Sequence, residues 1–107
     1  MTVSQDKLII YLKNTVNGIY KILPLFEEKN IGVDTYVDSL LFTLYSLDEV
    51  VDVKYGDEYI TVLATLESVK KEIVKPGANH SVVKREIFKS INIVKNMIDK
   101  LEGEKQK

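Results

Sequence analysis

Apolar residues recur at alternating intervals of three and four residues in four separate segments, and this spacing is the strongest constraint on the fold. An α-helix has 3.6 residues per turn, so residues spaced in this way line one side of a helix, whereas a half-buried strand alternates every second residue. The sequence therefore predicts an all-α fold. The four stripes are Ile9, Leu12, Val16, Ile19, Leu23 and Phe26; Val37, Leu40, Leu44, Leu47 and Val51; Tyr59, Val62, Leu66, Val69 and Ile73; and Ile87, Ile91, Val94, Ile98 and Leu101.

Each segment carries a second apolar row beside the first. A stripe of this width is typical of a helix that packs in a bundle, because a two-stranded coiled coil buries only a narrow seam. Connections of about two to six residues make consecutive helices antiparallel neighbours. We therefore predict an antiparallel four-helix up-down bundle. The second row consists of Leu8, Ile22, Leu41, Ile60, Leu63, Val83 and Met97.

Capping residues and sparse Gly and Pro predict where the helices end. The first helix should begin after Ser4 and end at Asn30 to Gly32, with a kink or break near Pro24, which cannot donate a backbone hydrogen bond. The other predicted helices cover about 34–54, 57–75 and 79–102, with Asp34, Asp57 and Asn79 or Ser81 as N-caps and Gly103 as the final stop.

The middle of the chain allows one competing interpretation. Residues 50–55 and 58–64 are rich in β-branched side chains, and Gly56-Asp57 between them is an acceptable hairpin turn. The helical spacing continues through Thr65 to Ile73 without a strand stop, so we favour helix ends over a hairpin in this region.

Length and composition indicate one domain. The chain has 107 residues, 45% of them hydrophobic, which is a globular composition of the size of one core. We assign residues 1–103 to a single helical-bundle domain and expect residues 104–107 to be a frayed tail. No apolar run approaches the roughly 18–20 residues of a membrane span, and the start lacks a signal-peptide pattern. We therefore expect a cytoplasmic protein without membrane contact.

Charge is unevenly distributed although the net charge is only -1. Residues 33–56 hold one lysine and five acids, whereas residues 78–107 hold seven basic residues and four acids. Two hypotheses explain this distribution: the charges form solvated helix faces, or they form complementary faces that bind a partner or a second copy. The second hypothesis makes Asp48, Asp52, Lys84, Arg85 and Lys89 candidate partner-binding residues.

No catalytic, cofactor or metal site is predicted. The chain has no Cys and a single histidine, His80, which is too few ligands for a zinc site, and it contains no Glu-x-x-His pair for a di-iron bundle. Gly-rich phosphate-binding motifs are also missing. An isoelectric point near 5.8 and a single Arg argue against nucleic-acid binding.

Tyrosine is the aromatic residue that stands out, with six copies and no Trp. Tyrosine packs at core edges, where its hydroxyl stays wet, and it is also enriched in protein interfaces. Tyr11 falls off the stripe of the first helix, and Tyr36 and Tyr55 flank the second helix. These three, if exposed, are further candidate partner-binding residues.

The composition and the helical pattern predict a non-enzymatic protein–protein interaction module that forms homo-oligomers. The alternative is an immunity- or antitoxin-like inhibitor, or a small phage-encoded regulator, that neutralises a partner protein through the acidic second helix. Fourteen lysines against one arginine are what AT-rich coding produces, so we expect a bacterial or phage origin.

Overall fold

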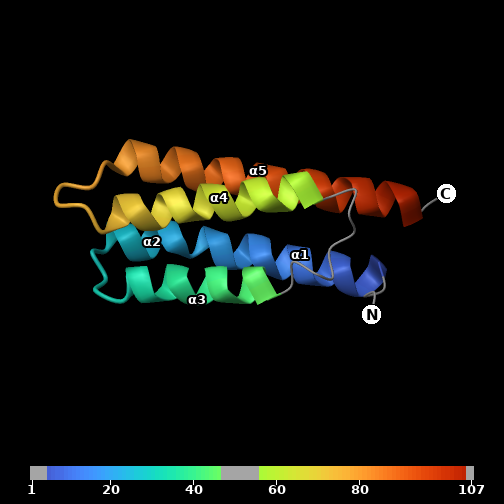
Figure 1. Ribbon diagram of the computed structural model, residues 1–107, viewed down its shortest axis with the longest axis horizontal. Coiled ribbons are helices and arrows are strands. Elements are labelled where there is room, and N and C mark those ends of the chain that lie inside the picture. The colour runs from blue at the N-terminus through green and yellow to red at the C-terminus, as the bar shows by residue number, and fades with distance from the viewer. Residues whose placement is uncertain (1–4, 47–55, 106–107) are drawn as a thin grey trace.

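The computed structural model describes residues 5–46 and 56–105, and the described residues are helical over most of their length, with no strand among them. The prediction of an all-α bundle is confirmed. In Figure 1, successive long helices run in alternating directions along the same long axis. The elements are α1 (Gln5–Tyr20), α2 (Ile22–Glu27), α3 (Val33–Ser46), α4 (Gly56–Ile73) and α5 (His80–Lys105).

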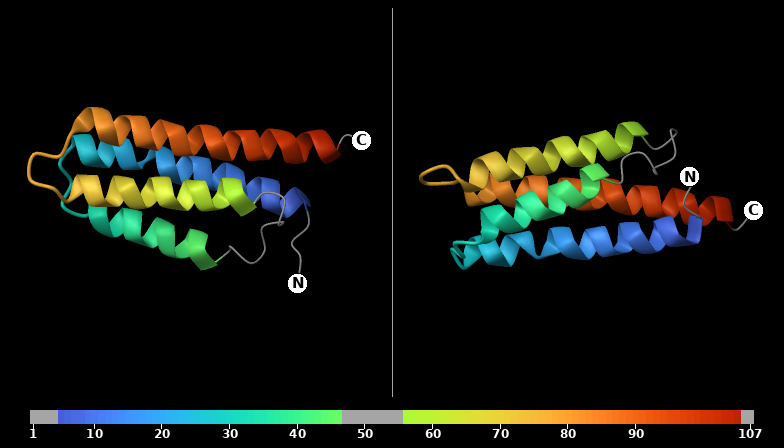
Figure 2. Two further views of the ribbon diagram at one scale, coloured as in Figure 1. Left: turned by 45° about the horizontal axis from the view of Figure 1, so that its top comes forward. Right: turned by 60° about the horizontal axis from the view of Figure 1, so that its bottom comes forward.

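Helix α5 is the helix on which most of the others pack. It shares extensive interfaces with α4 and α1 and also touches α2, whereas α3 packs on α4 and α2. The two views of Figure 2 show α3 and α5 at diagonally opposite corners of the bundle. The overall dimensions are 48 × 23 × 20 Å. The acidic α3 and the basic α5 are therefore separated within the chain by α4 and by α1–α2.

The core is the set of apolar stripes that the spacing predicts. Most described stripe residues are buried, and Leu23, Phe26, Leu40 and Ile73 pack partly buried against them. Six of the seven second-row residues are buried as well, which confirms that each helix has more than one neighbour. Ile60 is the exception, because it remains more than half exposed on α4.

Helices α1 and α2 are separated at Lys21, and the kink near Pro24 stays a prediction. Pro24 is the third residue of α2. Proline has no N–H, so it cannot donate to the carbonyl of Tyr20 four residues earlier, and α1 ends at that residue. Lys21 keeps helical backbone angles, with φ -69° and ψ -18°. The two helices therefore follow one another without a loop.

Helix α2 ends earlier than the sequence predicted, because Lys29 rather than Asn30 or Gly32 terminates it. Lys29 has a left-handed φ of 56°. Its N–H donates to the Phe26 carbonyl, and the Asn30 N–H donates to the Leu25 carbonyl, which is the Schellman pattern. Asn30 then accepts a hydrogen bond from the Gly32 N–H in the following turn. A residue with a Cβ occupies the position that usually requires glycine.

Three other predicted boundaries are also wrong. Helix α3 begins at Val33, so Asp34 lies in its first turn instead of capping it. Helix α4 begins at Gly56, so Asp57 lies inside its first turn instead of capping it. Since residues 56–64 are helical, the second strand of the alternative hairpin does not exist; its first strand lies outside the described residues. Helix α5 continues through Gly103 to Lys105. Gly103 has no positive φ, so it weakens the helix slightly without ending it.

The connection from α4 to α5 is held by Glu72. Its Oε1 accepts a hydrogen bond from the Asn79 N–H at 3.1 Å, and its Oε2 pairs with the Lys75 ammonium at 3.0 Å. Asn79 in turn caps α5, because its side-chain oxygen accepts the Val82 N–H, which confirms one of the two predicted caps. The hydrogen bond from Asn79 and the nearby Lys75 lower the pKa of Glu72.

Replacing Lys29 with glycine should stabilise the protein. Glycine adopts the left-handed conformation without a Cβ clash, and we expect a gain of about 0.5–1 kcal/mol in the free energy of unfolding. Urea titration followed by circular dichroism measures this change. Lys71→Gly, at an exposed position inside α4, is the matched control and should cost about 1 kcal/mol. If both substitutions destabilise the protein, the left-handed backbone conformation of Lys29 costs no free energy that glycine can recover, and the prediction is wrong.

The free energy of unfolding should depend on pH through the ionisation of Glu72. Because its pKa is lowered in the folded chain, its contribution is complete above the pKa of the unfolded chain, about 4.3, and is lost as the pH falls through the lower folded value. The stability difference between wild type and Glu72→Gln should therefore be largest near neutral pH and vanish in acid. Urea titrations at several pH values measure it. The comparison variant is Glu28→Gln, at an exposed position outside this hydrogen-bond network, and equal pH profiles for the two variants would contradict the role of Glu72.

Candidate interaction surfaces

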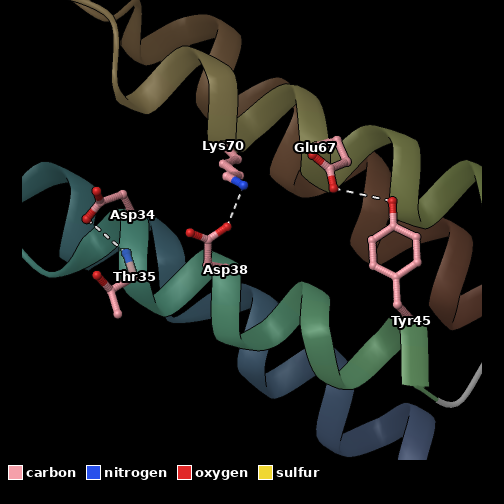
Figure 3. A network of polar contacts seen from close by, with 6 residues as sticks. All are labelled: Asp34, Thr35, Asp38, Tyr45, Glu67 and Lys70. Atoms are coloured by element: carbon pink, nitrogen blue, oxygen red, sulfur yellow. Dashed lines mark hydrogen bonds and ion pairs between the residues drawn. The ribbon is translucent and has the colours of Figure 1, made fainter.

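Polar side chains join the outer edges of α3 and α4 at two levels (Figure 3). Asp38 of α3 pairs with Lys70 of α4 at 2.5 Å. One and a half to two turns further along α3, the Tyr45 hydroxyl donates to Glu67 Oε1 at 3.3 Å. Because α3 and α4 run in opposite directions, these contacts fix which residues of the two helices lie side by side.

Large apolar side chains remain exposed along the same edge. Phe42 lies between Asp38 and Tyr45 on the helical surface of α3, and Ile60 lies seven residues, or two turns, before Glu67 on α4. Phe42 is 76% exposed, Ile60 58% and Tyr45 51%. We name this surface the α3–α4 face: Phe42, Tyr45 and Ile60 with Asp38, Glu67, Lys70 and Lys71.

The charges of the α3–α4 face balance. Asp38 and Glu67 oppose Lys70 and Lys71, so the face as defined has no net charge; Asp34, one turn before Asp38 on α3, lies beside it. The hydrogen bond with Asp38, together with the charge of this carboxylate, raises the pKa of Lys70. Desolvation and then the neighbouring Glu67 carboxylate raise the pKa of Tyr45. Lys70 is therefore cationic and Tyr45 neutral at physiological pH, which leaves the face neutral and partly apolar.

The outer side of α5 forms a second surface of different chemistry. Lys84, Arg85 and Lys89 are exposed there, as predicted for solvated or partner-binding positions. Beside them the ring of Phe88 meets the ring of Tyr20 from α1 edge to face, with centroids 6.2 Å apart and an interplanar angle of 77°. We name these residues, together with Lys95, the α5 face.

Lys95 connects the α5 face to a groove between α1 and α5. Its ammonium lies 5.6 Å from the centroid of the Tyr20 ring and 3.3 Å from the Tyr20 hydroxyl. The groove has a volume of about 490 Å³ and carries both signs of charge. Asp99 lines it together with Lys13 and Glu102, which form an ion pair at 3.0 Å.

Two of the predicted tyrosine candidates turn inward. Tyr11 packs against the core, where burial raises its pKa and its hydroxyl has no hydrogen-bond partner among the described residues. The Tyr36 hydroxyl donates to the Gly18 carbonyl at 2.7 Å. Tyr11 lies off the main stripe of α1 but still packs against the core, because α1 has packing neighbours beyond those on that stripe.

The other predicted residues divide into two groups. Lys84, Arg85 and Lys89 lie within two turns on the outer side of α5, so the structure brings them together. Asp48, Asp52 and Tyr55 lie outside the described residues. The acidic residues that are described on α3 have contacts within the fold: Asp38 binds Lys70, and Asp34 accepts the Thr35 N–H (Figure 3).

Sequence reasoning missed the exposed aromatic residues Phe42 and Phe88. Both lie outside the apolar stripes and outside the second row. A bulky apolar residue on the polar side of an amphipathic helix is the signal that could have indicated them. Periodicity did not reveal which of these residues would be covered by a neighbouring helix.

His80 is the first residue of α5, and its contacts are with α2. Its Nε2 lies 3.0 Å from Glu27 Oε2, and the Phe26 ring lies nearly parallel to its imidazole with centroids 6.3 Å apart. Across residues 5–46 and 56–105, no group of three or more His, Asp or Glu side chains is arranged to hold a metal ion. In the same ranges, no helix has the length and apolarity needed to cross a membrane.

Comparison with known proteins identified no relative of this chain. The chain matches no protein-family model, no curated protein and no solved structure. The functional assignment therefore depends on the chemistry of the two faces.

Removing the Tyr36 hydroxyl should test its structural role. Tyr36→Phe loses the hydrogen bond to Gly18, and we expect the free energy of unfolding to fall by about 0.5–1.5 kcal/mol, measured by urea titration. Tyr20→Phe is the matched control at an exposed ring and should cost less than about 0.5 kcal/mol. Equal effects of the two substitutions would show that the Tyr36 hydroxyl contributes nothing specific.

Proposed function

We propose that the chain is a non-enzymatic protein–protein interaction module that self-associates through the α3–α4 face. The observation that carries this proposal is the exposure of Phe42, Tyr45 and Ile60 on adjacent helices of a bundle whose core is otherwise closed. Burying a Phe side chain contributes about 1.5–3 kcal/mol, so several such residues on one surface favour association.

The electrostatics of the α3–α4 face support a second copy as the partner. A two-fold symmetric interface joins the same patch of both subunits, so a patch with net charge repels itself. The α3–α4 face avoids this repulsion because its two acids and two lysines balance. The α5 face, with three exposed basic residues and Lys95, would repel an identical surface. Of the two faces, the α3–α4 face is the one suited to self-association.

The alternative of an inhibitor that neutralises a partner remains a prediction. It depended on the acidity of the second helix, and the described acids of α3 are engaged by Lys70 and by the Thr35 N–H. No described residue of α3 favours this alternative over self-association.

Analytical ultracentrifugation over a wide range of protein concentrations tests the proposal. The wild-type chain should dimerise reversibly, and Phe42→Ser should raise the dissociation constant by about tenfold or more, because an apolar side chain of this size is no longer buried between the copies. Circular dichroism checks that the variant keeps its helices.

Ile10→Ser is the matched control, because Ile10 is equally apolar and is exposed on α1, away from the α3–α4 face. It should leave the dissociation constant unchanged. A wild-type chain that stays monomeric up to about 1 mM, or an Ile10→Ser variant that dissociates as readily as Phe42→Ser, would refute the proposal.

A further inference from the structure

The cations of the α5 face are not neutralised by the described part of the chain. Lys84 and Lys89 form no ion pair with a described residue, and Arg85 contacts only the neighbouring Glu86 at 3.4 Å. Lys95 is engaged with the Tyr20 ring and hydroxyl rather than with an acid. Exposed cations of this kind attract anionic partners and steer their approach.

Three acids elsewhere in the chain are already paired with other lysines. Asp38 binds Lys70 on α4, Glu58 binds Lys100 at 2.6 Å, and Glu102 binds Lys13. In addition, α3 lies diagonally across the bundle from α5, so its carboxylates cannot approach the α5 face (Figure 2). Lys84 and Lys89 therefore remain available to carboxylates of another molecule.

An aromatic pair lies beside these cations. Phe88 follows Lys84 by one helical turn and immediately precedes Lys89, and its ring contacts that of Tyr20. A partner that offers both carboxylates and an apolar side chain can use the cations and the rings together. The basic stretch from Lys84 to Lys95 extends about 17 Å along the helix axis, which equals about three turns of a partner helix.

We propose that the α5 face binds an acidic amphipathic helix of a partner protein. Carboxylates on this helix would pair with Lys84, Arg85 and Lys89, and an apolar residue between them would pack on Phe88. Binding to the α5 face does not require self-association through the α3–α4 face, because the two faces lie on different helices.

A protein helix fits this surface better than a nucleic acid does. Single strands bind by stacking bases on open ring faces. Here Lys95 lies against Tyr20, and the Tyr20 and Phe88 rings are nearly perpendicular, so they offer no parallel stacking platform. Asp99 and Glu102 line the groove beyond Lys95 and would repel a phosphate backbone that continued along α5. A helix that is acidic over only three turns avoids this repulsion.

A nuclear magnetic resonance titration of the full chain tests the inference. The probe is a synthetic helical peptide with Glu on one side and Leu between the Glu positions, three turns in length. We expect chemical-shift changes at the amides of residues 84–95, and an affinity that falls as salt is added. Lys84→Glu/Lys89→Glu and Phe88→Ser should each weaken binding by about tenfold or more.

Three comparisons make the result decisive. Lys71→Glu reverses an exposed lysine of the α3–α4 face and should leave peptide binding unchanged. The same peptide with Lys in place of Glu should not bind. Phe42→Ser should bind the acidic peptide as the wild type does, so that a failure of self-association and a failure of peptide binding are distinguished.

Several outcomes would overturn the inference. These are no shift changes up to about 1 mM peptide, equal binding of the Lys peptide, or an effect of Lys71→Glu as large as that of the α5 double variant. Tighter binding of a thymidine oligonucleotide than of the acidic peptide would assign the α5 face to nucleic acid instead.

Discussion

Burial of the α5 apolar stripe is the interaction on which the rest of the bundle depends. Val83, Ile87, Ile91, Val94 and Met97 are almost completely buried, and α1 and α4 pack on α5 more extensively than on any other helix. Each fully buried aliphatic side chain contributes about 1.5–3 kcal/mol, so this stripe alone supplies a large share of the burial that offsets chain entropy. Its polar side is consequently left to solvent, where the basic residues of the α5 face lie.

Helix α3 is held differently, because it has no contact of comparable extent with α5. Tyrosine hydroxyls join it to its neighbours on both sides: Tyr36 donates to the Gly18 carbonyl of α1, and Tyr59 of α4 donates to the Leu44 carbonyl of α3. Gly18 allows this close approach, since a Cβ at this position would lie 3.3 Å from Leu40 Cδ1. The abundance of tyrosine thus serves in part to position α3, and with it the α3–α4 face.

The two faces differ in chemistry because the in-chain ion pairs are unevenly distributed. Asp38 pairs with Lys70 across α3 and α4, which leaves a neutral surface with exposed Phe42. No comparable pair neutralises Lys84 or Lys89 among the described residues of the chain. A neutral, apolar surface is suited to an identical copy, whereas a basic surface is suited to an acidic partner. The two proposals together assign partners of different chemistry to opposite sides of one small bundle.

The sequence by itself determined the helical class and most of the core, and it narrowed the cap of α5 to Asn79 or Ser81, because helical period and capping chemistry are local properties. It also indicated the exposure of Lys84, Arg85 and Lys89. Only the tertiary structure decided that Tyr11 and Tyr36 turn inward and that Phe42 stays outside. It also decided that Lys29 takes the left-handed position and that α5 continues through Gly103. These outcomes depend on which neighbouring helix covers each side chain and on long-range contacts, which spacing along one helix does not specify.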